Sequence, residues 1–344
     1  MKVMPADSGS VATWAHWDEA NALAAVWTEK KRGKGEDAPP TGLYHRSGAR
    51  GVIAVYDGAG GAGAREVGRT PDEEVSGAFV ASRAARFALE DWFVTTAPKR
   101  QLDDGGDLHG ALLDGLRQTG ITPSGKIRGD MVRHLPTTVA AIEYEICNDR
   151  VELASRWAGD SRAYVVHPNI GLQAITMDDT HDSDALVLLL NDQPMTNVVC
   201  ADRAFAVNQF LGTEPPMLPV VLACATDGFY NYVLTPAHFE YLLLQTMQDA
   251  GDMAQWAQAL AAQVQQYTSD DASLVIAALG YQTYTAMQRN YQRRHKLLSN
   301  RYIRPFGQAQ ESGDDSVIAA TRRDQWAMYR EGYEAWIRRM EASR

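Results

Sequence analysis

The sequence predicts an α+β fold built from antiparallel strands and amphipathic helices. Apolar and β-branched residues predict strands at 151–157 and 162–167, joined by the turn Gly159-Asp160-Ser161. A connection this short excludes a parallel crossover, so we expect antiparallel strands there. Apolar residues at helical spacing predict helices over residues 75–92, 108–117, 236–247 and 253–265.

The strand predicted at residues 52–56 carries the most information, because it is continuously apolar and ends at an acid. A strand with one face in water would alternate, so this run indicates burial on both faces. Asp57 follows it, and the glycines after Asp57 let the backbone turn sharply. Acids border other apolar runs in the same way, at Asp160, Asp227 and Asp270-Asp271.

The remaining elements are assigned from local pattern. Residues 14–27 fit either a short helix or a first strand ending near Thr28, and residues 186–191 and 195–201 also fit helix or strand. Residues 30–40 are charged and rich in glycine, which predicts a loop whose backbone can approach a ligand. Further strands are predicted at residues 135–146, 219–225 and 274–279.

Residues 281–344 differ from residues 1–280, and we predict a domain boundary there, with a helical, basic C-terminal extension. The extension holds 12 Lys or Arg and 7 Asp or Glu, a net charge of +5, which leaves −15 for residues 1–280. We expect its apolar stripe to pack on the body of the protein, the alternative being a face that docks a partner. The stripe has the spacing of an amphipathic helix and comprises Trp326, Tyr329, Tyr333, Trp336 and Met340.

Composition excludes several classes of protein. The formal net charge of −10 argues against non-specific nucleic-acid binding. Three cysteines without ligand-like spacing argue against a disulfide framework or a zinc site. No apolar run approaches the ~20 residues of a membrane span, and the N-terminus lacks a signal-peptide pattern. We therefore expect a cytoplasmic protein without nucleic-acid or membrane partners.

The acids at strand ends indicate a metal site. Carboxylates gathered at one face repel one another unless a cation lies between them. A set of oxygen ligands without a His or Cys cluster favours Mg²⁺ or Mn²⁺ over Zn²⁺. Two such ions sharing a carboxylate activate a water for in-line attack on phosphorus. The pattern therefore indicates hydrolysis of a phosphate ester.

Five short motifs occur in a fixed order along residues 25–280. They are Arg32-Gly-Lys-Gly-Glu36-Asp37, Val55-Tyr-Asp57-Gly58-Ala-Gly60-Gly61, Gly159-Asp160-Ser161-Arg162, Thr226-Asp227-Gly228 and Asp270-Asp271. In order and interval they resemble the metal-dependent protein phosphatases, the type 2C serine/threonine phosphatases, and their bacterial members in particular. The resemblance implies a four-layer α/β/β/α sandwich, with two antiparallel sheets flanked by helices and metal ions at one end.

The resemblance also implies roles for individual residues. Asp57 would bridge two Mn²⁺ or Mg²⁺ ions, with Glu36 and the carbonyl of Gly58 completing one site. Arg32, four residues before Glu36, would bind the substrate phosphate, for which a guanidinium fork is well shaped. The other implied ligands are Asp227 and Asp270 for the first ion and Asp160 for a third, weaker ion.

Several neighbouring residues have less direct roles. Asp37 and Asp271 are expected to support the ligands, and Asp271 replaces an asparagine that many relatives have. Asp160 is alternatively a structural acid tied to its own turn. We expect Arg162 to be a structural ion-pair partner rather than a substrate contact.

The chain departs from many eukaryotic relatives at Ala59, where they have a histidine thought to protonate the leaving group. Bacterial relatives often lack that histidine too. His45 and His181 are candidates to replace it, although each fits a solvated loop histidine better. The segment Asp178-Asp-Thr-His resembles only loosely the corresponding segment of relatives near the flap.

These observations predict a phosphoprotein phosphatase that acts on phosphoserine or phosphothreonine by direct attack of a metal-activated water, without a phosphoenzyme. Its partners would be a phosphoprotein substrate and a cognate serine/threonine kinase, as in signalling by reversible phosphorylation. The alternative is a catalytically silent phosphatase-like domain that binds a partner through residues 281–344. The retained acids favour the enzyme. The sequence does not decide between Ser/Thr and Tyr substrates.

Overall fold

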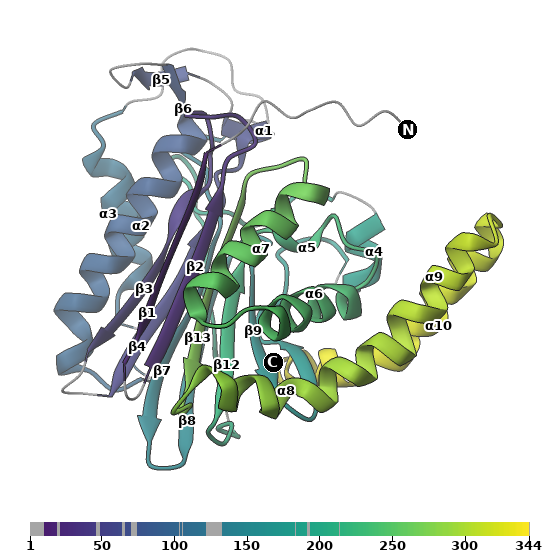
Figure 1. Cartoon of the computed structure of the whole chain (residues 1–344). Coiled ribbons are helices and arrows are strands. Elements are labelled where there is room, and N and C mark those ends of the chain that lie inside the picture. Colours follow the sequence, from purple (N-terminus) through teal and green to yellow (C-terminus); the bar gives the residue numbers. More distant parts are fainter. Residues whose placement is uncertain are drawn as a thin grey trace.

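The computed structural model describes residues 10–18, 21–45, 49–63, 66–69, 74–102, 104, 106–121, 133–182, 184–190, 193–212 and 214–343. Within this part of the chain, two antiparallel sheets lie face to face, and helices cover the outer face of each (Figure 1). The expected α+β class and four-layer arrangement are confirmed.

The larger sheet has six strands, all antiparallel to their neighbours. Its strands, in spatial order, are β1 (Val11–Trp17), β2 (Asn21–Thr28), β13 (Ala272–Leu279), β12 (Val220–Ala225), β9 (Arg162–His167) and β10 (Gly171–Ala174).

The second sheet has five antiparallel strands. In spatial order they are β11 (Asn208–Leu211), β8 (Arg150–Ala158), β7 (Val139–Cys147), β4 (Arg50–Tyr56) and β3 (Ala38–His45). A separate pair, β5 (Glu66–Arg69) and β6 (Glu74–Ser76), leads into the first long helix.

Two helices cover each sheet (Figure 1). Helices α2 (Gly77–Thr96) and α3 (Leu108–Gln118) lie on the five-stranded sheet, and α6 (Pro236–Asp249) and α7 (Met253–Tyr267) lie on the six-stranded sheet. All four agree with the predicted helices to within a few residues. The short elements are α1 (Gly60–Gly63), η2 (Ala97–Lys99), α4 (Ala185–Leu190) and α5 (Asp227–Tyr230).

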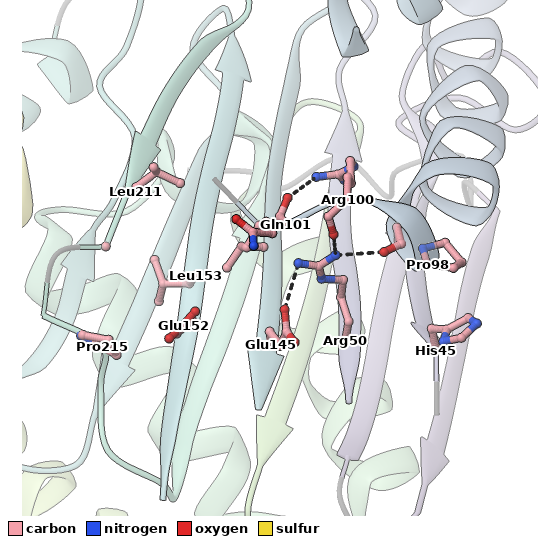
Figure 2. A pocket seen from close by; sticks show the side chains of 13 residues that line it. His45, Arg50, Pro98, Arg100, Gln101, Glu145, Glu152, Leu153, Leu211 and Pro215 are labelled. Carbon is pink, nitrogen blue, oxygen red and sulfur yellow. Dashed lines mark hydrogen bonds and ion pairs between the residues drawn. The ribbon is translucent and has the colours of Figure 1, made fainter. Parts of the chain in front are cut away.

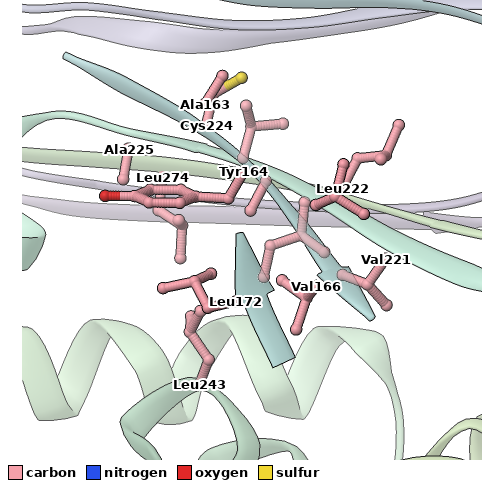
Figure 3. Packing of buried hydrophobic residues seen from close by; sticks show 14 of the residues in the cluster. Ala163, Tyr164, Val166, Leu172, Val221, Leu222, Cys224, Ala225, Leu243 and Leu274 are labelled. Carbon is pink, nitrogen blue, oxygen red and sulfur yellow. The ribbon is translucent and has the colours of Figure 1, made fainter. Parts of the chain in front are cut away.

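Strand β4 is buried on both faces, as its continuous apolar run predicts. Ile53 and Val55 belong to the large core between the sheets, whereas Val52, Ala54 and Tyr56 belong to the cluster under α2 and α3. The large core continues beneath α6, where Tyr164 and Leu172 of the six-stranded sheet point toward Leu243 (Figure 3).

The C-terminal extension forms a series of helices. They are α8 (Tyr284–Leu298), the π-helical turn η3 (Ser299–Ile303), α9 (Arg304–Glu311), α10 (Asp315–Tyr333) and α11 (Ala335–Ser343). Part of α9 and α10 runs away from the sheets (Figure 1). All five residues of the aromatic stripe are buried in the large core, at most 6% exposed, so packing on the body is confirmed. The stripe is divided between α10 and α11, which meet at Glu334, rather than lying on one helix.

Three predictions about secondary structure are corrected. Strands β8 and β9 do not pair, because the turn at residues 159–161 carries the chain from one sheet to the other. Strand β8 pairs with β7 and β11, and β9 pairs with β10 and β12, so each strand gains two neighbours in its own sheet. Residues 14–27 form parts of two strands, β1 and β2, and not a helix or a single strand. Residues 195–201 form no helix or strand beyond an isolated bridge at Val199.

Among the described residues, no helix is both long enough and apolar enough to cross a lipid bilayer.

Candidate active site

The pairing registers bring the acids of the sequence motifs to one end of the two sheets. In the six-stranded sheet Ala225 pairs with both Arg162 and Leu274, so β12 ends where β9 and β13 begin. In the other sheet β4 ends beside the start of β7, since Val55 pairs with Ala140. The four acids found together at this end are Asp57, Asp160, Asp227 and Asp270.

Asp57 is held through its backbone, which leaves its carboxylate available. Its carbonyl accepts hydrogen bonds from the Thr138 amide and the Thr137 hydroxyl, both at 2.8 Å. Its amide donates to the Thr138 hydroxyl at 3.2 Å. Burial, followed by the charges of Asp37, Asp227, Asp160 and Asp270, raises the pKa of Asp57 well above its usual range.

The backbone after Asp57 lies directly against Glu36, which explains the glycines there. A Cβ on Gly60 would lie 1.8 Å from Oε2 of Glu36, and a Cβ on Gly58 would lie 2.6 Å from the carbonyl oxygen of Glu36. The contact at Gly58 is with backbone atoms and excludes a side chain there, whereas a side chain at Gly60 would force the end of the Glu36 side chain to move. Glycine at these two positions therefore allows the Glu36 carboxylate to approach the Asp57 corner.

Glu36 is oriented by the N-terminus of α2. The hydroxyl of Ser76, which caps this helix by accepting from the Phe79 amide, also donates a short hydrogen bond to Oε1 of Glu36. Burial is the main cause that raises the pKa of Glu36, and the charges of Asp271 and Asp270 raise it further. Ser76 lies inside the helix predicted from residue 75, so the sequence pattern did not single it out as the cap.

Asp271 clamps the loop that carries Glu36. Its two carboxylate oxygens accept from the Lys30 amide at 2.7 Å and the Glu36 amide at 2.6 Å. Burial nevertheless raises the pKa of Asp271. With both oxygens bound to backbone amides, Asp271 supports the site from behind. The side chain of its neighbour Asp270 accepts from the Asp271 amide at 2.9 Å.

Asp37 also lies behind the site. It is 2% exposed, and its Oδ2 accepts from the Thr226 hydroxyl at 2.8 Å, which ties the start of β3 to the residue before Asp227. Burial is the largest cause that raises the pKa of Asp37 far above normal, and the charge of Asp271 is the next. Asp37 thus lies beneath the acids that line the site, and its proximity is one of the causes that raise the pKa of Asp57.

Asp227 and Asp160 are brought together by a local network. Asp227 begins α5, and its Oδ2 accepts from the side-chain Nδ2 of Asn231 at 3.0 Å. Tyr230, on the same turn of helix, donates its hydroxyl to the carbonyl of Asp160. The Oδ1 atom of Asp160 is buried and has no hydrogen-bond partner within the described part of the chain. Burial, then the charge of Asp227, raises the pKa of Asp160 to about 8.

The turn that carries Asp160 has a geometry that only glycine satisfies. Gly159 has φ of +100°, and a Cβ there would lie 2.7 Å from the Thr138 side chain. Thr138 in turn shares a 2.6 Å hydrogen bond with the Ser161 hydroxyl and accepts from the Asp57 amide. The Asp160 turn and the Asp57 corner are therefore linked through one threonine that the sequence did not identify.

Arg162 is a structural ion-pair partner, as expected. Its guanidinium makes a bidentate pair with Asp178, with Nε to Oδ1 at 2.9 Å and Nη2 to Oδ2 at 2.7 Å. Both side chains are less than 10% exposed. The guanidinium also lies 4.1 Å from the centre of the Tyr230 ring. This pair holds the residues that flank Asp160 and does not present Arg162 to a substrate.

Arg32 and the two histidines differ in their positions. The Arg32 side chain is exposed, and no described residue forms an ion pair or hydrogen bond with it. His181 is exposed on the loop between β10 and α4. His45 ends β3 opposite Arg50, at the far end of the sheet from Asp57, so His45 is excluded as a proton donor for this site.

A cavity of about 750 Å³ lies at this far end and not among the acids. Its wall includes Arg50, whose guanidinium binds Glu145 at 2.8 Å and the carbonyls of Ala97 and Arg100 (Figure 2). A smaller cavity of about 320 Å³ lies at the acidic end, where it is lined by Glu36, Asp270 and Asp271 among others. Three acids of the sequence motifs therefore line the smaller cavity.

The acids fit a hard divalent cation. Their oxygens are acceptors, the Asp160 Oδ1 atom is buried without a partner among the described residues, and burial, followed by mutual charge, raises the pKa of Asp57 and Asp160. A cation bound among them would relieve each of these costs. Within the described ranges, no three His, Cys, Asp or Glu side chains meet as a closed ligand set. The acids are neighbours around one sheet edge, with Glu36 on the side of Asp270 and Asp271.

Comparison with known proteins identifies the fold. No protein-family model and no curated protein matches the chain in sequence. Among solved structures, the serine/threonine phosphatase PstP/Ppp of Mycobacterium tuberculosis is 18% identical, with a TM-score of 0.51 over 76% of this chain and all of that one. A structure of the PstP catalytic domain with two manganese ions, also 18% identical, has a TM-score of 0.46 over 76% of this chain and 99% of that one. The first likeness shows that this chain has the fold of PstP/Ppp.

Proposed function

We propose that this chain, whose fold is that of a bacterial serine/threonine phosphatase, is itself a metal-dependent phosphoprotein phosphatase. The observation that carries the proposal is the convergence of the five sequence motifs on one end of the sheets. Chance would not place Asp57, Asp160, Asp227 and Asp270 together with raised pKa values for two of them. The fold supplies the frame, and these acids support the chemistry.

Two Mn²⁺ or Mg²⁺ ions are the proposed cofactors, and Asp160 is the proposed ligand of a third, weaker site. The residues that would hold them are Asp57, Asp227, Asp270, Glu36 and the carbonyl of Gly58. When bound, such ions supply a water of lowered pKa and neutralise charge on the phosphoryl group. The sequence order of the ligands and the orphaned Asp160 Oδ1 atom support this assignment.

The chain's own residues prepare the site in three ways. Ser76 and Asp271 fix the Glu36 side chain and backbone. Thr138 holds the Asp57 corner against the Asp160 turn. The exposed guanidinium of Arg32, which pairs with no described residue, is available to bind two oxygens of a substrate phosphate, as Arg does at such anions. Each contribution orients a group before the substrate arrives, which lowers the entropic cost of reaction.

The proton for the leaving serine or threonine must come from a group other than residue 59, which is alanine. His45 is too far away, and His181 is a solvated loop residue. We propose that solvent held near the acids supplies this proton. The proposed substrates are phosphoproteins, and a serine/threonine kinase is the natural counterpart of such an enzyme.

The test is hydrolysis of p-nitrophenyl phosphate with Mn²⁺, Mg²⁺ or EDTA. We expect Mn²⁺-dependent turnover by the wild type and a loss of at least about 100-fold in kcat for Asp57→Ala and Asp227→Ala, because each removes a proposed ligand. Asp149→Ala is the matched control, since Asp149 is exposed in the β7–β8 turn at the other end of the sheet. Wild-type activity equal to that of the Asp57 and Asp227 variants with every metal refutes the proposal.

The silent alternative is less well supported. It assigned partner binding to the C-terminal extension, but the aromatic stripe of that extension is buried in the core. Calorimetric titration with Mn²⁺ separates the two functions, because a silent domain without a metal site gives no heat of binding.

A further inference from the structure

Basic side chains gather at the mouth of the acidic site. Three of the seven lysines in the chain, Lys30, Lys31 and Lys34, lie within five residues, and Arg32 lies among them. Residues 1–280 as a whole carry a strong negative charge, with a net charge of −15 that includes these four cations. We call residues 30–34 the lysine loop. The lysine loop is therefore a positively charged segment within an acidic part of the chain.

The lysine loop is anchored to the site by carboxylates beneath it. Glu29 accepts from the Gly33 amide at 2.8 Å and the Gly35 amide at 3.2 Å. Asp271 accepts from the Lys30 amide at 2.7 Å, and the Lys34 amide donates to the Lys31 carbonyl at 3.0 Å. Four backbone amides are therefore fixed, so the loop presents its side chains from a defined backbone beside the proposed metal ligands.

The three lysines line the cavity of about 320 Å³ that also contains Glu36, Asp270 and Asp271. Glu74 and Phe79 also line this cavity. The Lys30 and Lys31 side chains are exposed, and no described residue forms an ion pair with either. The lining of this cavity thus combines proposed metal ligands with two lysine ammonium groups that pair with no described residue.

We propose that this cavity binds acidic residues that flank the phosphorylated residue of a substrate, so that Lys30 and Lys31 select phosphopeptides with Asp or Glu close to the phosphosite. This inference rests on the proposed function, because it takes the phosphate to lie among Asp57, Asp227 and Asp270. Carboxylates beside the phosphate would then reach the lysine loop. A neutral peptide would gain nothing from it, and the acidic surface elsewhere would repel an anionic peptide that missed the loop.

Exposed ion pairs set the size of the effect. Each contributes up to about 1 kcal/mol, or about fivefold, and weakens with salt. Two pairs predict that kcat/KM for an acid-flanked phosphopeptide exceeds that for its Asn/Gln-flanked counterpart by about three- to tenfold at low ionic strength. The preference should shrink toward one as salt approaches about 1 M, where charges are screened over about 3 Å.

The experiment compares the wild type, Lys30→Ser/Lys31→Ser and the control Lys99→Ser/Lys296→Ser on the two phosphopeptides with Mn²⁺. Lys99 and Lys296 are exposed and lie outside the cavity. We expect the ratio of kcat/KM values to fall toward one in the first variant and to stay at the wild-type value in the control. Fluorescence anisotropy with the same peptides, labelled, measures the preference without turnover.

A wild-type ratio near one, or an equal loss on both peptides in Lys30→Ser/Lys31→Ser, overturns the inference and leaves the proposed phosphatase intact. Absence of hydrolysis of either peptide and of p-nitrophenyl phosphate counts against the proposed function. In that case anisotropy still decides on the lysine loop, because equal binding of the two peptides shows that it does not select acidic residues.

Discussion

Replacing Asp160 by asparagine should stabilise the metal-free protein, although Asp160 lies in the proposed site. Its pKa is raised from 3.8 to about 8 by burial and by Asp227. A raised pKa means that the folded state binds the proton more tightly than the unfolded state does. Stability from this group is therefore complete below about pH 4 and is lost as the pH rises through about 8. Asparagine cannot ionise and avoids that loss.

Because the pKa of Asp160 rises from 3.8 to about 8, replacing it can increase the free energy of unfolding by at most about 6 kcal/mol, at about 1.4 kcal/mol for a tenfold change in proton affinity. Water at the edge of the site screens the charges, so we expect a gain of about 1–2 kcal/mol at pH 8. For a chain of 344 residues, with an unfolding entropy of about 2.1 cal/mol/K per residue, that gain raises Tm by about 1.5–3 °C. The difference between variant and wild type should narrow as the pH falls toward about 4.

Thermal unfolding followed by circular dichroism, in EDTA and in saturating Mn²⁺ at pH 5 and pH 8, checks this expectation. In Mn²⁺ the wild type should gain more Tm than Asp160→Asn, because a ligand that binds only the folded state stabilises it by mass action. Asp149→Asn, in the exposed turn at the opposite end, should behave as wild type throughout. A variant that is less stable than wild type in EDTA at pH 8, or that responds equally to Mn²⁺, would refute the reasoning.

Two further predictions test the packing around the site. Gly60→Ala places a Cβ 1.8 Å from Oε2 of Glu36, so the Glu36 side chain must move. We expect the affinity for Mn²⁺, measured by calorimetry, to fall about tenfold or more, with little change in Tm. An unchanged affinity would contradict the proposed role of Glu36. Tyr333→Ala removes a 2% exposed ring of the C-terminal extension from the large core and should cost about 3–5 kcal/mol in chemical denaturation. A cost below about 1 kcal/mol would show that α10 is not part of the folded core.

Much of the fold could be predicted because local pattern and local geometry agree. The apolar run before Asp57 specified a strand buried on both faces, and β4 contributes to both hydrophobic clusters. The helical spacing of residues 75–92 and 253–265 corresponds to α2 and α7. Burial of the aromatic stripe followed from its spacing, because a helix with one apolar stripe must cover it.

Pairing between strands could not be predicted in the same way. The turn at Gly159 looks like a hairpin in sequence, yet it joins two sheets, because hydrogen bonding to β7 and to β12 outweighs the pairing of sequence neighbours. Likewise, nothing in residues 14–27 shows that the chain reverses to form both β1 and β2.

The sequence alone singled out the acids that we propose as metal ligands, because a strand-end acid followed by glycine is a local feature that recurs at Asp57 and Asp227. Only the tertiary structure decided how these acids are supported. Ser76 and Thr138 come from segments remote in sequence from the residues they hold, and their hydroxyls act by proximity alone. Hydrogen bonds and mutual charge depend on distances of a few ångströms in space, which chain order does not encode.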